Sequence, residues 1–174
     1  MNPLSPTARQ FVLHWGEMSS RWGINRTMAQ IHALLYLSPE PLNAEQIATT
    51  LAVARSNVST SLRELRAWGI VRVVHLLGDR RDYFEAIQDV WQMFRVILEQ
   101  RKRREIDPTI ALLRDCTEQA GKASTETAYA QKRMRELLGL LETLTAWYEQ
   151  MGKLPASVQR KVLRMGGKIR KLAG

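Results

Sequence analysis

One stretch, residues 42–86, constrains the fold of this chain most, because it combines a helix, a tight turn, a second helix and a hairpin pattern in that order. Asn43 has the side chain of a helix N-cap, and Gln46 three residues later completes a capping box. A helix is therefore predicted to begin directly after Asn43. Val53 and Ala54 are expected to form the turn that follows it.

A second helix is predicted from residue 55 to residue 68, before Gly69, which is a natural helix C-terminus. Val58, Leu62 and Leu65 recur at intervals of four and three residues, so they share one face of this helix. That face is expected to pack inward.

The opposite face of the second helix is polar. At about 100° per residue, it presents short hydrogen-bonding side chains and one long cation, namely Ser56, Asn57, Thr60 and Arg63. Base edges in the major groove of DNA offer donors and acceptors to such side chains. We therefore predict that this helix reads bases in the major groove.

A β-hairpin is predicted directly after the second helix. Residues 70–76 and 82–86 are two β-rich runs, and residues 78–81 between them read Gly-Asp-Arg-Arg. Asp79 is placed to orient Arg80 or Arg81 through a charge-assisted bond. A small helical core with an unrelated hairpin is the alternative, but the complete order of elements favours a winged helix whose wing meets phosphates or the minor groove.

The residues predicted to contact double-stranded DNA are mostly basic or small and polar. They are Arg55, Ser56, Asn57, Ser59, Thr60, Arg63, Arg66, Arg72, Arg80 and Arg81.

These motifs resemble a known family. Residues 51–65 resemble the recognition segment of MarR-type winged-helix regulators, and residues 78–86 resemble the wing of the GbsR branch of that superfamily. Four further segments are similar to that branch: residues 15–16, 22–27, 38–42 and 103–108. The resemblance covers residues 4–150 and implies a sequence-specific transcriptional regulator, expected to be a repressor, that acts as a homodimer.

One position departs from the family pattern. Relatives usually place Ser or Thr where this chain has Ala54, and Ala cannot cap a helix, which costs roughly 1 kcal/mol. Ser56 is expected to take over as the cap, which would shift the helix start and the register of base contacts slightly.

The remainder of the chain is predicted to be helical, over residues 6–22, 25–37, 89–104 and 107–150. Unbroken, the last of these helices would span roughly 60 Å. An apolar stripe of that length needs a partner, most simply the same helix of a second subunit. The small and weakly helical residues 121–130 favour a bend or a break.

The predicted fold class is mainly α with a small β-hairpin wing, that is, a winged helix-turn-helix with long dimerisation helices. Four regions are expected: N-terminal helices for packing and dimerisation (1–37), a winged helix-turn-helix DNA-binding domain (38–87), a helical dimerisation region (88–152) and a basic C-terminal helix or tail (153–174).

Positive charge gathers at the C-terminus, since residues 151–174 hold seven Lys and Arg and no Asp or Glu. Such a run attracts phosphate without reading bases, so it is expected to add affinity rather than specificity, unless it only solubilises the chain. A non-specific architectural nucleic-acid binder driven by this tail is the alternative function. Association with a membrane surface is a further alternative, against which the absence of Trp and Phe from the tail argues.

Signs of other chemistry are few. The sequence has no phosphate-binding glycine loop and no metal-ligand spacing, and its three histidines are scattered, so neither an enzyme nor a cofactor is predicted. The single cysteine, Cys116, excludes an internal disulfide and suits a reducing cytoplasm. No run approaches the ~20 apolar residues of a membrane span.

Five tryptophans are many for a chain of this length: Trp15, Trp22, Trp68, Trp91 and Trp147. Aromatic rings around a cavity can hold a quaternary ammonium by cation–π attraction. The GbsR branch is associated with choline and glycine-betaine metabolism, so the resemblance implies such a small-molecule effector as one option. The alternative, which we favour, is that these rings pack the dimer core and the helix junctions.

Overall fold

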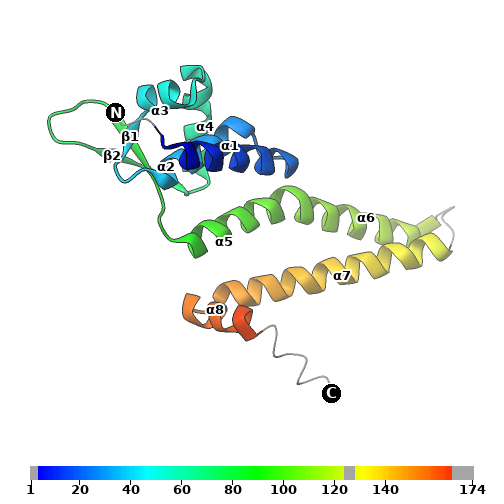
Figure 1. Ribbon diagram of the computed structural model, residues 1–174. Coiled ribbons are helices and arrows are strands. Elements are labelled where there is room, and N and C mark those ends of the chain that lie inside the picture. Colours follow the sequence, from blue (N-terminus) through cyan, green and yellow to red (C-terminus); the bar gives the residue numbers. More distant parts are fainter. Residues whose placement is uncertain (1–3, 124–127, 166–174) are drawn as a thin grey trace. The chain divides into compact units, whose positions relative to one another are not determined.

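The computed structural model describes residues 4–123 and 128–165 of the chain. The chain divides into two compact units, residues 1–96 and residues 97–174. Helices dominate both units, and the first unit also holds a small three-stranded antiparallel sheet (Figure 1). The predicted fold class, mainly helical with a small wing, is confirmed.

The first unit begins with two helices whose starts follow the sequence signals. Helix α1 spans Pro6–Arg21, and the Ser5 hydroxyl accepts a hydrogen bond from the Ala8 backbone N–H at 3.2 Å. Helix α2 spans Arg26–Leu37, and the side chain of Asn25 caps it through the Met28 N–H at 3.0 Å. Each cap satisfies a backbone donor that the first turn of a helix leaves without a partner.

The helix-turn-helix consists of α3 (Ala44–Leu51) and α4 (Arg55–Ala67). The predicted capping box is confirmed, because Asn43 Oδ1 accepts from the N–H groups of Glu45 and Gln46 while Gln46 Oε1 accepts from the Asn43 N–H. Ala52 follows α3 as its C-cap residue, and its φ of 53° places it in the left-handed region.

The expectation that Ser56 caps α4 was wrong. Helix α4 starts at Arg55 with Ala54 at the N-cap position, and no side chain caps it. The Val58 N–H already bonds to the Ala54 carbonyl at 3.2 Å, so Ser56 lies inside the first helical turn. Burial of Val58 in the core holds this start, which outweighs the missing cap.

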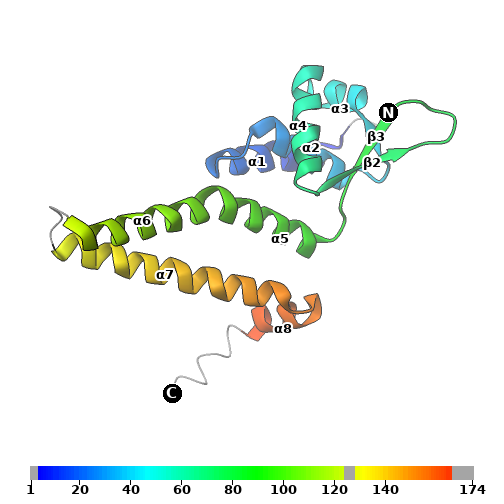
Figure 2. The same ribbon diagram turned by 180° about the vertical axis from the view of Figure 1, so that it is seen from behind.

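The sheet has the order β1-β3-β2 and consists of β1 (Leu42–Asn43), β2 (Val71–His75) and β3 (Asp82–Ala86). Strand β1 was not predicted, because two residues are too few to show an alternating pattern. The predicted hairpin of β2 and β3 is confirmed, and its loop projects beyond the helices of the first unit in both views (Figures 1 and 2). This hairpin is the wing.

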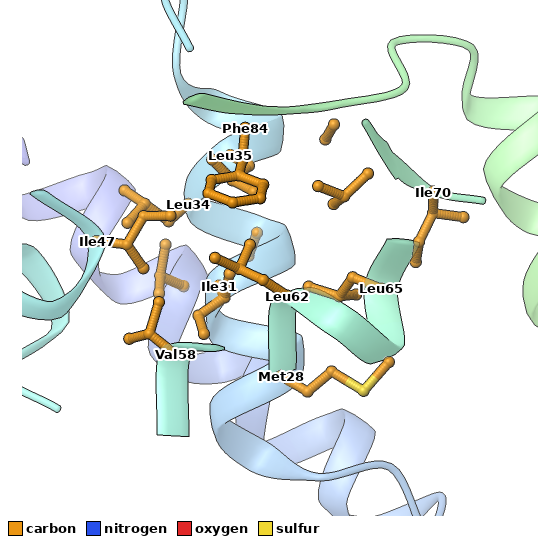
Figure 3. Packing of buried hydrophobic residues seen from close by; sticks show 14 residues of the cluster. Met28, Ile31, Leu34, Leu35, Ile47, Val58, Leu62, Leu65, Ile70 and Phe84 are labelled. Atoms are coloured by element: carbon orange, nitrogen blue, oxygen red, sulfur yellow. The ribbon is translucent and has the colours of Figure 1, made fainter. Parts of the chain in front are cut away.

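The core of the first unit forms around α2, which is buried from Met28 to Leu35. Figure 3 shows residues of α2 facing the predicted inward side of α4, with Phe84 of β3 above them. The inward set of α4 is confirmed, since Val58, Leu62 and Leu65 are all buried. Because this face is held in the core, the opposite face of α4 must lie outside.

Helices α1 and α2 approach each other closely at Gly16. A Cβ atom at this position would lie 2.6 Å from Cγ of Gln30, which is itself buried. The glycine therefore allows a contact that any other residue would disturb.

The second unit begins within α5 (Val90–Arg101). The chain continues through a π-helical turn, η1 (Lys102–Ile106), directly into α6 (Asp107–Ala123). Helix α6 thus begins at Asp107 as predicted, but the chain reaches it through the π-helical turn without leaving the helical conformation. Pro108 has no backbone N–H, so it cannot donate a hydrogen bond to a carbonyl oxygen of the preceding helical turn. The wider π-helical turn lies where this hydrogen bond is missing.

Helix α7 (Ala128–Lys153) lies antiparallel beside α6, so the helical stretch predicted over 107–150 is divided into two helices, as the weakly helical residues 121–130 indicated (Figures 1 and 2). Arg114 of α6 and Glu142 of α7 form an ion pair at 2.7 Å. Lys102 contacts Asp107 at 3.0 Å and Glu149 at 3.3 Å. Part of the apolar stripe thus finds its partner within the same chain, because folding back buries apolar surface that a single rod would expose.

The basic C-terminal segment begins with a defined helix, α8 (Ala156–Met165). Gln159 is buried, and its Nε2 donates to the carbonyl oxygens of Met151 at 3.0 Å and Leu154 at 2.8 Å. This contact joins α8 to the end of α7. The basic residues Lys168, Arg170 and Lys171 lie outside the described residues. In the described part of the chain, no helix combines the length and the apolar character needed to cross a membrane.

Candidate nucleic-acid interface

The polar face of α4 is exposed as predicted. Ser56, Asn57, Thr60 and Arg63 all lie on the outside of the helix, away from the buried set. Packing against α2 holds the helix along its length, so this face is presented on a rigid element. Such a face meets the steric and chemical needs of a helix in the major groove.

The wing carries an ordered arrangement around Arg81. Arg81 Nε donates to both carboxylate oxygens of Asp79, at 3.0 and 3.1 Å, which confirms that Asp79 orients one of the two arginines. The Tyr83 hydroxyl donates to Asp79 at 2.8 Å, and the Arg81 guanidinium lies 5.7 Å from the centre of the Tyr83 ring. The role of Tyr83 was not predicted, because only the hairpin brings it back toward the loop.

The contacts between Arg81 and Asp79 shift the pKa values of both side chains. Hydrogen bonds from Arg81 and Tyr83 hold the pKa of the Asp79 carboxyl well below its usual range. The same carboxylate raises the pKa of the Arg81 guanidinium. The pair therefore stays charged throughout the physiological pH range, and the direction of the Arg81 side chain is set before any ligand arrives.

The other two predicted arginines of the wing differ in their surroundings. Arg80 is exposed and makes no hydrogen bond or ion pair with the residues that the structure describes. Arg72 of β2 pairs with Glu85 of β3 at 2.5 Å. Arg80 is thus free to meet an external anion, whereas Arg72 already has a carboxylate partner.

A hollow of about 370 Å³ lies between the start of α3, the side of α4 and the wing. Five of the predicted residues line it: Arg55, Ser59, Arg63, Arg66 and Arg81. Two carboxylates, Glu45 and Asp82, line it as well. The structure therefore brings arginines of α4 and of the wing together, although Arg66 and Arg81, the nearest two in the sequence, are fifteen positions apart.

Asn43 also lines this hollow, and the sequence showed only its role as a helix cap. The residue is buried, with 3% of its surface exposed. Its Oδ1 accepts the two backbone bonds of the cap, which identifies the other amide atom as Nδ2. That Nδ2 has no hydrogen-bond partner among the described residues.

A second, smaller pocket of about 190 Å³ lies between α1, α2 and α5 within the first unit. Apolar and aromatic side chains line it, including Trp15 and Tyr36, together with His32. Burial lowers the pKa of His32 to about 4, so its ring is neutral near pH 7. His32 Nε2 has no partner among the described residues.

The tryptophans differ in how much of each side chain is exposed. Trp15 and Trp68 pack against the core of the first unit, whereas Trp22 is 49% exposed and Trp147 of the second unit is 57% exposed. Over residues 4–123 and 128–165, no group of three His, Cys, Asp or Glu side chains could hold a metal ion.

Comparison with known proteins gives the same fold. Residues 22–82 match the model of the MarR family. The chain is 26% identical over 146 residues to the HTH-type transcriptional regulator MmpR5 of Mycobacterium tuberculosis, covering 81% of this chain and 84% of that protein. A crystal structure described as a transcriptional regulator has a TM-score of 0.62 and 23% identity, covering 83% of this chain and 95% of the other.

The matched segment contains α3, α4 and most of the wing. The chain therefore has a winged helix-turn-helix fold, and its residues 22–82 are similar to the MarR family.

Proposed function

We propose that this protein is a sequence-specific repressor of transcription that binds double-stranded DNA as a cytoplasmic homodimer. Helix α4 enters the major groove, and the wing contacts the flanking backbone or the minor groove. The observation that carries the proposal is the exposed polar face of α4, held outward by the burial of Val58, Leu62 and Leu65.

The contacts divide between two surfaces. On α4, Ser56, Asn57, Thr60 and Arg63 face outward and can exchange hydrogen bonds with base edges. On the wing, Arg80 is free and Arg81 is oriented by Asp79, so both can meet negative charge beside the groove. Assignment to the GbsR branch is part of the same proposal and has its support in the wing motif and the N-terminal motifs.

Selection of bound sequences from random duplex DNA tests this function directly. A two-fold symmetric preferred sequence is expected, because a symmetric dimer presents two copies of α4. The Arg63→Ala variant should lose ~1–3 kcal/mol of binding free energy on that sequence and lose its preference at one base position. The Arg9→Ala variant, which removes an exposed arginine of α1, serves as the matched control.

Two results would contradict the proposal. Equal binding of the Arg63→Ala variant and the parent would exclude base reading by Arg63. Binding to all duplexes alike, with a steep dependence on salt, would instead support a non-specific architectural protein.

A small-molecule effector, which the resemblance implies, remains a part of this proposal. The small apolar pocket beside α2 supports it, because α2 packs against α4 and an occupant of the pocket would lie against α2. The neutral His32 ring and the lack of a carboxylate in that lining favour an uncharged occupant over a quaternary ammonium.

A further inference from the structure

We infer that the hollow between α3, α4 and the wing binds one phosphate group of the DNA backbone, and that Arg55, Arg66 and Asn43 act there as positioning residues that do not read bases. This inference rests on the proposed function and separates its contacts into two classes. A phosphate contact fixes the orientation of the protein on DNA but carries no sequence information.

The geometry of α4 places the two arginines beside the outward face. Arg66 follows Arg55 by eleven residues, which at about 100° per residue brings the two within roughly 20° of each other around the helix axis. Thr60 lies roughly 140° from Arg55 on the same count. Arg55 and Arg66 therefore point to the side of the helix that borders the hollow, and Thr60 points away from it.

The charges in the hollow favour an anion of phosphate type. Arg55, Arg63 and Arg66 make no ion pair with the residues that the structure describes. Arg81 comes from the wing with its side chain already oriented by Asp79. The lining carboxylates, Glu45 and Asp82, and Asp79, which pairs with Arg81, number three against four arginines, so a net positive charge is left for a ligand. Arginine offers planar pairs of N–H donors that match the oxygens of a phosphate.

Asn43 supplies an independent indication of a ligand. Its amide is buried and is fixed by the capping box, and Nδ2 nevertheless has no acceptor among the described residues. A buried donor without a partner is unfavourable and rare in native proteins. A phosphate oxygen in the same hollow would supply the missing acceptor at the N-terminal end of α3, where negative charge is also stabilised by the helix.

The test uses the full-length protein and the preferred duplex obtained by selection. Each backbone phosphate of that duplex is replaced in turn by a neutral methylphosphonate, and the affinity is measured for the parent, for Arg66→Gln and for Asn43→Ser. Serine also caps helices, so Asn43→Ser removes the amide donor while it keeps α3 capped. Asn25→Ser at the cap of α2 and Arg9→Gln on α1 are the matched controls.

We expect neutralisation of one phosphate in each half-site to weaken binding of the parent and of both controls roughly tenfold, the size of a lost charge-assisted contact. Arg66→Gln and Asn43→Ser should bind the unmodified duplex less tightly and should be insensitive to that one replacement. Their preferred base sequence should be unchanged, and the dependence of log affinity on log salt should become shallower by about one for Arg66→Gln. Arg66→Lys should keep most of the salt dependence.

Two outcomes would overturn the inference. The variants could remain as sensitive as the parent to every neutralised phosphate. Arg66→Gln could also change the preferred base at one position, which would make Arg66 a base reader. Failure of the parent to select any sequence would instead refute the proposed function, so the two failures are distinguishable.

Discussion

Single residues in this protein gain their roles from their neighbours. Arg81 differs from Arg80 only by one position, yet Asp79 and Tyr83 orient Arg81 while Arg80 is left exposed. Asn43 caps a helix and also lines the arginine-rich hollow. His32 shows the same principle in the core, where burial among apolar side chains keeps its ring uncharged.

At this scale, the His32→Phe variant should change the pH dependence of stability. The pKa of His32 is about 4 in the folded protein and 6.5 in the absence of structure, so between these values only the unfolded chain binds the proton. The parent should therefore keep its full free energy of unfolding above pH 6.5. As the pH falls toward 4, protonation of His32 in the unfolded chain should lower that free energy by about 3 kcal/mol. Urea unfolding at several pH values should show a smaller fall for His32→Phe. Identical pH profiles would contradict the burial of a neutral His32.

At the scale of the elements, contacts between helices decide how a substitution of a helical glycine affects stability. Gly16 lies where α1 meets Gln30 of α2, whereas Gly139 lies in α7 with open space around it. Gly16→Ala should destabilise the protein by about 1–3 kcal/mol, because its Cβ forces neighbouring atoms apart. Gly139→Ala should stabilise it by about 0.5–1 kcal/mol, because alanine favours the helix. Urea unfolding of both variants checks the pair, and equal effects of the same sign would show that the close approach at Gly16 is absent.

For the whole molecule, the proposed homodimer needs an apolar surface, and α7 carries one. Its exposed large apolar side chains recur at helical spacing: Leu137, Leu140, Leu144 and Trp147. Leu144, which is 53% exposed, lies within this row and is suited to a test of its role. An apolar row of this kind is typical of a surface that pairs with another helix.

The Leu144→Glu variant should therefore form monomers and lose tight binding to the preferred duplex, because a buried charge would disfavour the dimer. Sedimentation equilibrium at micromolar concentration, with and without DNA, measures both effects. The parent should form a dimer whose two α4 helices lie about one DNA turn apart, roughly 34–36 Å. Thr143→Glu on the same helix is the matched control. A parent that is monomeric both free and on DNA would refute the homodimer.

The sequence alone determined the features that depend on near neighbours. The capping box at Asn43, the inward set of α4 and the hairpin were all predicted, because a few adjacent residues carry each of these signals. The set of arginines that could meet DNA was also visible, although their division between bases and phosphates was not.

Tertiary structure alone decided the features that join distant parts of the chain. Packing of Val58 in the core set the start of α4 despite the uncapped Ala54, and pairing of Arg114 with Glu142 accompanies the folding back of α7 on α6. The hollow that unites Asn43, α4 and the wing has the same origin. These outcomes depend on which surfaces bury each other, and local sequence patterns do not carry that information.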